Sequence, residues 1–258
     1  MLLAIDSGNT NTVFALMEGQ EVRGRWRATS DPRRTADEYI VWLGQLMKLD
    51  GFALEAVDGV MVSNVVPAAR YNLQRLCERH FGGPPTTVKE AAAGFPIEIR
   101  LTRPENIGDD RICNAIGAHA RFPGALIILD FGTATTFDVV AADGGYEGGA
   151  IAPGINLSLD ALYQGAAHLP RIMVERPDAV IGRDTVPAMQ SGVFWGYVGL
   201  IEGLISRIKQ AFRQPMTVVA TGGLAPIFSD TTEAIQHVDH DLTLRGMRIL
   251  YDHAAAAA

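Results

Sequence analysis

The stretch Leu2–Leu16, LLAIDSGNTNTVFAL, decides the fold of this chain. Its apolar run Leu2–Ile5 predicts a buried strand, and a second run, Val13–Leu16, predicts another. The residues between them are turn formers, so the stretch is typical of a β-hairpin. Gly8 lets a ligand approach the backbone, and the N–H groups of such a turn can surround an anion. Asp6, at the end of the first strand, is placed to hold a metal ion such as Mg²⁺, which keeps several of its waters when it binds a protein.

The same pattern occurs again at Leu126–Val140, LIILDFGTATTFDVV, where Asp130 aligns with Asp6. A third strand is expected after each hairpin, at Glu21–Ala28 and at Tyr146–Ala152. A repeat with such a long period indicates two related domains, because the repeats of solenoid proteins are far shorter. One turn of this kind is weak evidence, because a plain hairpin explains it equally well, whereas two matched turns predict a pair of phosphate-binding turns.

Strands and helices alternate through the rest of the chain, which places it in the α/β class. We expect an N-terminal domain at residues 1–117 and a C-terminal domain at residues 118–258. Thr35 and Glu38 have the spacing of a capping box, which predicts that a helix begins there. Near the end, Val238–Leu244 is expected to be a strand, followed by a helix.

A long helix is expected from about Pro187 to Phe212. It contains four glycines that are unfavourable inside a helix unless another backbone packs closely against them. They are Gly192, Gly196, Gly199 and Gly203. We therefore expect a close helix–helix contact here, either within the chain or between subunits.

The composition excludes several classes of protein. The chain has 258 residues, of which 48% are hydrophobic and 20% charged, as in a folded globular protein. Its net charge of −7 argues against general nucleic-acid binding, and no apolar run is long enough to cross a membrane.

Cys77 and Cys113 lack metal-ligand spacing and are expected to be buried reduced thiols. The N-terminus has no basic region typical of a signal peptide, so we expect a cytoplasmic protein. His168 is expected to be a packed or surface residue.

The most charged stretch of the first half is RLTRPENIGDDR, which ends at Arg111 and leads into an apolar helix. Gly108, Asp109, Asp110 and Arg111 then lie at the helix N-terminus, where backbone N–H groups and the dipole favour anions. Simple N-capping by one of the two aspartates is the alternative. A kinase needs a carboxylate near the acceptor hydroxyl and positive charge for the transferring phosphoryl group.

A further buried strand, Met216–Ala220, runs into Gly222 and Gly223. Bare glycine backbone at the end of a strand lets a flat ring such as adenine lie against it. Ordinary turn geometry would explain the two glycines equally well.

Together, the two turns and the paired glycines resemble the nucleotide-binding plan of the actin, Hsp70 and sugar-kinase superfamily. Within it, the chain is similar to the type III pantothenate kinase family over essentially its full length. The similar segments are IDSGNTNTVFAL, GDDR, DFGTATTFD, GGAIAPGI and the MQSG segment after Thr185. The resemblance implies two related ribonuclease-H-like domains with the nucleotide cleft between them. It also implies phosphorylation of pantothenate by ATP to 4′-phosphopantothenate, the first step of coenzyme A biosynthesis.

The resemblance further implies a role for each matching residue. Asp110 would be the general base, Asp130 would bind a monovalent cation (K⁺ or NH₄⁺), and Asp6 would bind Mg²⁺. Thr185 would reach pantothenate from the partner subunit, which implies a homodimer. The remaining substrate contacts would be Gly108, Asp109 and Arg111. The ATP contacts would be Asp6, Ser7, Gly8, Asn9, Thr10, Asn11, Thr12, Val13, Thr133, Gly222 and Gly223.

Two positions depart from the family pattern. Leu101 stands where the family often has a substrate-contacting tyrosine, and Asp109 stands where it usually has alanine. The extra carboxylate beside Asp110 could raise the pKa of that base by like-charge repulsion. Two alternatives therefore remain, a kinase for another small hydroxyl compound and a catalytically silent nucleotide-binding regulator.

Overall fold

The computed structural model describes residues 1–166 and 169–257. His168 and the last alanine lie outside the described residues, so the expectation for His168 stays a prediction. The chain forms two compact units. The first unit contains residues 1–98, 102–117 and the segment from Asp241 onward, and the second contains residues 99–101 and 118–240.

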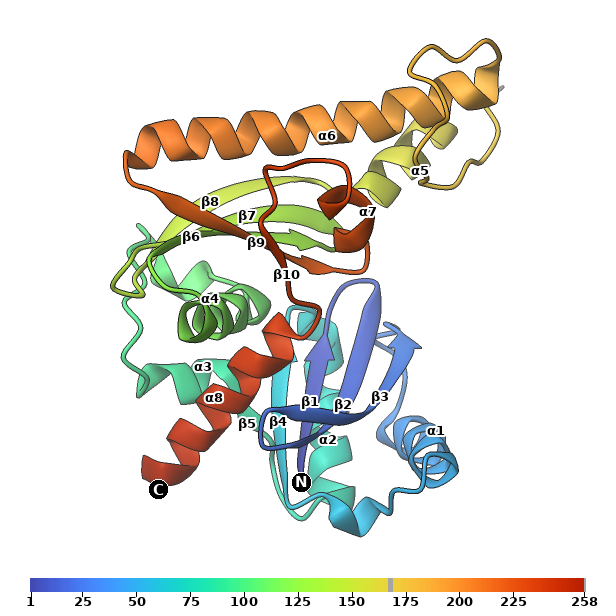
Figure 1. The fold of residues 1–258 in the computed structure, drawn as a ribbon. Helices are drawn as coiled ribbons and strands as arrows, with labels where there is room; N and C mark the ends of the chain where they lie inside the picture. The colour runs from blue at the N-terminus through green and yellow to red at the C-terminus, as the bar shows by residue number, and fades with distance from the viewer. Residues whose placement is uncertain (167–168, 258) are drawn as a thin grey trace. The chain divides into compact units, whose positions relative to one another are not determined.

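The first unit is built on a five-stranded sheet of order β3-β2-β1-β4-β5 (Figure 1). Its strands are β1 (Leu2–Ser7), β2 (Asn11–Glu18), β3 (Glu21–Thr29), β4 (Gly59–Asn64) and β5 (Thr86–Thr87). The β1–β2 and β2–β3 pairs are antiparallel, whereas β4 is parallel to both β1 and β5. The apolar run of β1 is fully buried, and Leu3 and Ile5 pack in one core cluster with Tyr39, Leu43 and Leu73 from outside the sheet.

Helices cover this sheet. They are α1 (Ala36–Leu49), α2 (Arg70–His80), α3 (Val88–Ala93), α4 (Asp109–Arg121) and α8 (Leu242–Ala257), with short 3₁₀ turns at Leu54–Ala56, Pro67–Ala69 and Pro104–Asn106. The predicted capping box is confirmed, because Thr35 and Glu38 each accept a hydrogen bond from the backbone N–H of the other. Cys77 and Cys113 are buried free thiols, as expected.

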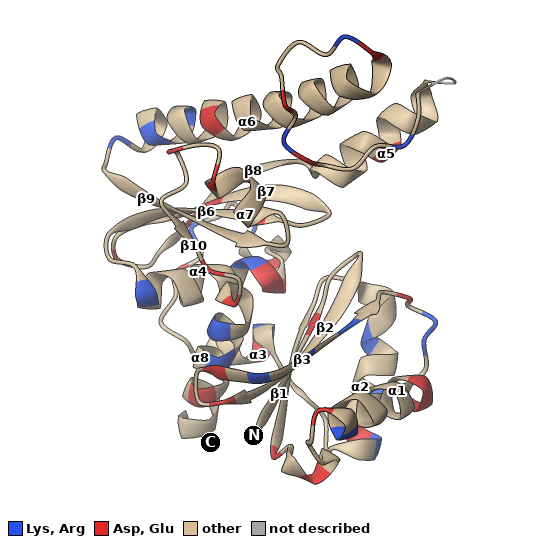
Figure 2. Ribbon diagram, turned by 45° about the vertical axis from the view of Figure 1, so that its right-hand side comes forward, with Lys and Arg blue, Asp and Glu red and all other residues tan. Residues whose placement is uncertain are grey.

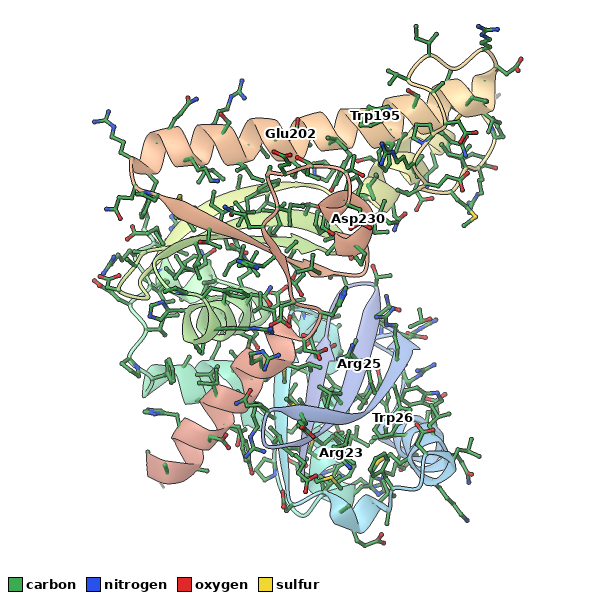
Figure 3. The ribbon with its side chains drawn as sticks, viewed as in Figure 1. Arg23, Arg25, Trp26, Trp195, Glu202 and Asp230 are labelled. Carbon is green, nitrogen blue, oxygen red and sulfur yellow. The ribbon has the colours of Figure 1, made fainter. Side chains whose placement is uncertain are left out.

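Strand β3 presents different side chains to its two faces (Figure 3). Trp26 is buried, and its Nε1 donates a hydrogen bond of 2.8 Å to Asp50 Oδ2. Arg25, the residue before it, is partly exposed and pairs with Asp241. Arg23, two residues before Arg25, is also exposed and pairs with Glu18 and Glu21.

The expected late strand at Val238–Leu244 is wrong. The strand β10 contains only His237–Val238, and helix α8 begins at Leu242. Leu242 and Leu244 are buried on this helix, so a short apolar run that is ambiguous by periodicity forms helix here. The structure also assigns α8 to the first unit, whereas the sequence-based division placed it in the C-terminal domain.

The second unit repeats the plan of the first. Its sheet has the order β10-β9-β6-β7-β8, with strands β6 (Ala125–Phe131), β7 (Ala134–Val140), β8 (Tyr146–Pro153) and β9 (Met216–Gly222) beside β10. The β6–β7 and β7–β8 pairs are antiparallel, and β9 is parallel to β6 and β10. Strand for strand this is the first sheet again, so the predicted pair of related α/β domains is confirmed.

The helices of the second unit are α5 (Ile155–Gly165), α6 (Thr185–Phe212) and α7 (Ala225–Ser229). The long helix α6 lies along one face of the sheet (Figure 1) and packs Phe194, Tyr197 and Ile201 into the core. Before Glu202 it carries no charged residue (Figure 2). A Cβ added at Gly192, Gly196 or Gly199 would meet no atom of the described chain within 4 Å. A close contact within the chain, one of the two expected explanations of these glycines, is therefore wrong.

Candidate active site

The first carboxylate of the candidate site is Asp6, which lies near the carboxyl end of β1. It is in register with Val13 on β2 and with Ser63 on the parallel strand β4. The Ser63 hydroxyl donates a hydrogen bond of 2.8 Å to Asp6 Oδ1. The position of this carboxylate is therefore fixed by the sheet and by a side chain on the neighbouring strand.

Hydrogen bonds fix the base of the turn after Asp6, and the residues at its tip are exposed. Gly8 N donates to Asn11 O at 3.0 Å, and the Ser30 hydroxyl donates to Gly8 O at 2.6 Å. Ser30 N also donates to Thr10 O at 3.0 Å. Asn9 and Thr10 are exposed at the tip of the turn. These bonds fix the backbone of the turn, and its tip is polar and exposed, as a phosphate-binding turn requires.

Gly108, Asp110 and Arg111 form a compact group at the start of α4. Asp110 Oδ1 accepts a hydrogen bond of 2.8 Å from Arg111 N. A Cβ at Gly108 would lie 2.5 Å from this same oxygen, closer than non-bonded atoms approach. Glycine at position 108 therefore leaves the space that the Asp110 carboxylate occupies.

Asp6, Asp109 and Asp110 form one acidic cluster within the first unit. Burial is the main cause that raises the pKa of Asp6 to about 6; the Ser63 hydrogen bond opposes it, and the charges of Asp110 and Asp109 add to it. Burial also raises the pKa of Asp109, against the Asn64 hydrogen bond and the nearby Lys89 and Arg70. The cluster therefore has a negative field that a bound cation would relieve.

The donor set at Asp6 fits a hydrated Mg²⁺ ion rather than a metal enclosed by protein ligands. Among the described residues, no group of three or more His, Cys, Asp and Glu side chains could hold a metal ion. Mg²⁺ usually keeps several waters and takes one or two carboxylates together with phosphate oxygens. A single partly buried carboxylate beside a phosphate-binding turn matches that preference.

In the second unit, Asp130 lies near the end of β6, as Asp6 does on β1. It is in register with Thr136 on β7 and Thr221 on β9. The turn that follows is closed by Gly132 N, which donates to Ala134 O at 3.1 Å. Thr133 is exposed at this turn. The Asp130 carboxylate and the hydroxyl oxygens of Thr136 and Thr221 are ligands that fit a monovalent cation. The hydroxyl of the exposed Thr133 can donate to a phosphate oxygen.

The two glycines after β9 differ in what they require. Gly222 has a φ of +90°, and an added Cβ would lie 2.6 Å from Phe131 O on the adjacent strand. Gly223 faces open space, with no described atom within 4 Å of an added Cβ. Gly222 is therefore needed for the backbone path, and Gly223 leaves bare backbone that a flat ring could cover.

Thr185 is the first residue of α6 and is exposed. It belongs to the second unit, whereas Gly108–Arg111 belong to the first. Leu101 also belongs to the second unit, and its Cδ2 lies 3.2 Å from the Cβ position of Gly148. Neither residue is part of the carboxylate cluster that the first unit assembles by itself.

Three residues of the site were missed by sequence reasoning. Ser63 holds Asp6, Ser30 holds the Gly8 turn, and the backbone of Asn64 holds Asp109 through a 3.1 Å hydrogen bond. A signal for two of them was present, because Ser63 and Asn64 end the apolar run that predicts β4. In a parallel pair, polar residues at the end of one strand lie beside those at the end of its neighbour.

Two sheets of equivalent strand order, each with an aspartate-headed turn, define a protein of the actin, Hsp70 and sugar-kinase ATPase fold. A sequence model of the family described as type III pantothenate kinase matches residues 2–207. The chain belongs to the type III pantothenate kinase family and is therefore a kinase.

Individual relatives agree with that assignment. The type III pantothenate kinase of Rhodospirillum rubrum is 56% identical over 97% of this chain and 98% of its own length. That of Phenylobacterium zucineum is 54% identical over the full length of both chains. The high coverage means that the similarity includes both units.

Solved structures support the fold alone. A conserved putative Baf family transcriptional activator from Campylobacter jejuni has a TM-score of 0.63 at 19% identity and covers 98% of this chain and 99% of its own. A putative 2-dehydro-3-deoxygalactonokinase from Sinorhizobium meliloti has a TM-score of 0.59 at 14% identity, over 100% and 99% of the two chains. At such low identity, neither similarity carries over an activity.

Proposed function

We propose that this chain transfers the γ-phosphoryl group of ATP to the 4′-hydroxyl of pantothenate, giving 4′-phosphopantothenate and ADP, the first step of coenzyme A biosynthesis. The observation that carries the proposal is the carboxylate cluster of the first unit, in a chain that belongs to the type III pantothenate kinase family. The cluster supplies an acceptor-side carboxylate, Asp110, together with a cation-side carboxylate, Asp6. These are two groups that phosphoryl transfer needs.

Asp110 acts as the general base. It takes the proton of the acceptor hydroxyl while the hydroxyl oxygen forms a bond to the γ-phosphorus and the bond to the β–γ bridging oxygen breaks. The Arg111 N–H and the space at Gly108 hold the carboxylate in one orientation, which supports this role. Gly108 and Arg111 are proposed to hold the acceptor around it. Orientation matters because phosphoryl transfer depends mainly on positioning and charge neutralisation.

The nucleotide is bound through its phosphates and its base. The turn from Asp6 to Val13 binds the phosphates in the first unit, and Thr133 binds them in the second. Gly222 and Gly223 accept the adenosine. Mg²⁺ at Asp6 and a monovalent cation at Asp130 would supply the positive charge that neutralises the phosphate oxygens.

The chain acts as a homodimer in which Thr185 contacts pantothenate bound to the partner subunit. Two features of the second unit support this assembly. Apolar side chains are exposed on and between α5 and α6, among them Ile181 (82% exposed) and Met173 (77% exposed). Gly192, Gly196 and Gly199 of α6 leave room for another backbone to approach. Exposed apolar surface of this kind marks protein–protein contacts.

A coupled assay of ADP release tests the activity. We expect ADP release from the wild-type chain that depends on pantothenate, Mg²⁺ and a monovalent cation. Asp110→Asn should lower kcat by about 10²–10⁴-fold, the contribution of a general base. Asp37→Asn, which changes an exposed ion-paired carboxylate on α1, should have no effect. Full activity of Asp110→Asn would reject the role of Asp110.

A kinase for another hydroxyl compound is the second candidate, because Leu101 departs from the family pattern. A panel of small hydroxyl acceptors at fixed ATP separates the two. A higher kcat/KM for another acceptor than for pantothenate would favour this second function. Binding of ATP without ADP release for any acceptor would instead indicate a silent regulator.

A further inference from the structure

The carboxylate of Asp109 is 7% exposed, although it comes next to the proposed catalytic Asp110. Its Oδ2 accepts a hydrogen bond of 3.1 Å from the backbone N–H of Asn64, at the end of β4. This contact joins the first turn of α4 to a strand far away in the sequence. The Asp109 carboxylate is therefore occupied by the protein's own backbone.

The sheet explains why Asn64 needs this partner. Strand β5 has only two residues and pairs with Met61 and Val62 of β4. The N–H of Asn64 lies two residues further along, beyond the end of β5 in the described chain. Asn64 is partly buried, where an N–H without a partner is costly, and Asp109 supplies the acceptor.

Other groups near Asp109 favour its charged form. Arg70 and Lys89 oppose the effect of burial on the Asp109 carboxyl. Arg70, Lys89 and Asp109 all line a pocket of about 400 Å³ in the first unit, whose wall includes Asn64. The carboxylate thus accepts a hydrogen bond from a backbone N–H and lies in the favourable field of two cations.

We infer that Asp109 is a positioning residue that fastens the start of α4 to the end of β4 and thereby fixes the orientation of Asp110. The inference rests on the proposed function and gives Asp109 a positioning role in place of the acceptor contact that the family resemblance implies. Gly108, Asp109 and Asp110 are consecutive, so a shift of the Asp109 backbone moves the groups around the base. Misplacement of a catalytic group by about 1 Å can cost about 10²-fold in rate.

Two substitutions at this position separate the possible roles. Asp109→Ala removes the acceptor and should lower kcat by about 10–100-fold with little change in the KM for pantothenate. Asp109→Asn keeps an oxygen that can accept from Asn64 N, and its kcat should stay within about threefold of wild type. Asp58→Ala is the control, because Asp58 also accepts a hydrogen bond, from the N-terminal ammonium of Met1, but is exposed at the opposite end of β4.

Each other outcome contradicts the inference. A raised KM for pantothenate at unchanged kcat in Asp109→Ala would show that the carboxylate holds the acceptor. Equal losses in both variants would show that the charge acts rather than the hydrogen bond, and wild-type kinetics in both would show no role.

A structural readout keeps the inference testable whatever the activity. Amide hydrogen exchange at Asn64 should be at least about tenfold faster in Asp109→Ala than in wild type, and near wild type in Asp109→Asn. Unchanged exchange would overturn the fastening role.

Wild-type protein without pantothenate-dependent ADP release would instead reject the proposed function, while the exchange rates still decide the role of Asp109. If Asp109→Ala does not fold, a loss of kcat in a folded Asp109→Asn would overturn the inference, and wild-type kinetics there would support it.

Discussion

At the scale of single residues, the site depends on space as much as on charge. Gly108 is the clearest case, because its missing side chain leaves room for the Asp110 carboxylate. We expect Gly108→Ala to lower kcat by about 10²-fold, since the carboxylate must move to avoid the new methyl group. Steady-state kinetics measure this. Gly94→Ala is the control, because a Cβ there meets no described atom within 4 Å and its φ of −99° suits alanine. Equal kinetics of both variants would contradict the role of Gly108.

Asp6 gives a prediction about stability at the same scale. Its pKa rises from 3.8 to about 6 on folding, so the folded chain disfavours the charged form. Stability from this group is present below pH 4 and is lost as the pH rises through about 6. Without Mg²⁺, Asp6→Asn should therefore be more stable than wild type by about 1–3 kcal/mol at pH 8, and similar near pH 4. Urea unfolding at the two pH values tests this, and a difference independent of pH would contradict it.

At the scale of secondary-structure elements, two helices of the first unit meet backbone to backbone. A Cβ at Gly246 of α8 would lie 1.9 Å from Cys113 O on α4, and one at Gly117 would lie 2.5 Å from Leu242 O. Gly246→Ala must therefore separate the helices and should destabilise the chain by about 2–4 kcal/mol in urea unfolding.

The matched control for this contact is Gly203→Ala in α6. Its nearest neighbour would be the flexible end of Arg207 at 3.3 Å, so the change should stabilise the helix by up to about 1 kcal/mol. If both variants were equally stable, the close packing of α4 against α8 would make no contribution to the free energy of unfolding. Since α4 also carries Asp110, this helix contact supports the site as well as the fold.

At the scale of the whole molecule, assembly is the property to test. Gly196 lies on the exposed glycine face of α6, and a larger side chain there would meet no atom of its own described chain within 4 Å of the Cβ. We expect the wild-type chain to have twice the mass of one chain by light scattering, and Gly196→Leu to shift toward a single chain. Gln210→Leu, at the charged end of the same helix, should remain a dimer. A wild-type monomer would reject the homodimer and the shared role of Thr185.

Much of the fold follows from sequence. The repeated strand–turn–strand pattern around Asp6 and Asp130 predicts both sheets, because apolar runs and turn formers act locally. The capping box at Thr35 likewise predicts the start of α1, because it too acts locally. The apolar run around Leu242 was misread, because a run of that length fits either a strand or a helix until its packing partner is known.

The sequence by itself determined the two aspartate-headed turns, the family and the identity of the candidate site residues, since these depend on residue type and spacing along the chain. Only the tertiary structure decided that Ser63 holds Asp6, that Asp109 is tied to Asn64, and that α8 packs in the first unit. Each of these joins residues that are distant in the sequence. Such contacts depend on which strands and helices become neighbours, and no local sequence pattern shows that.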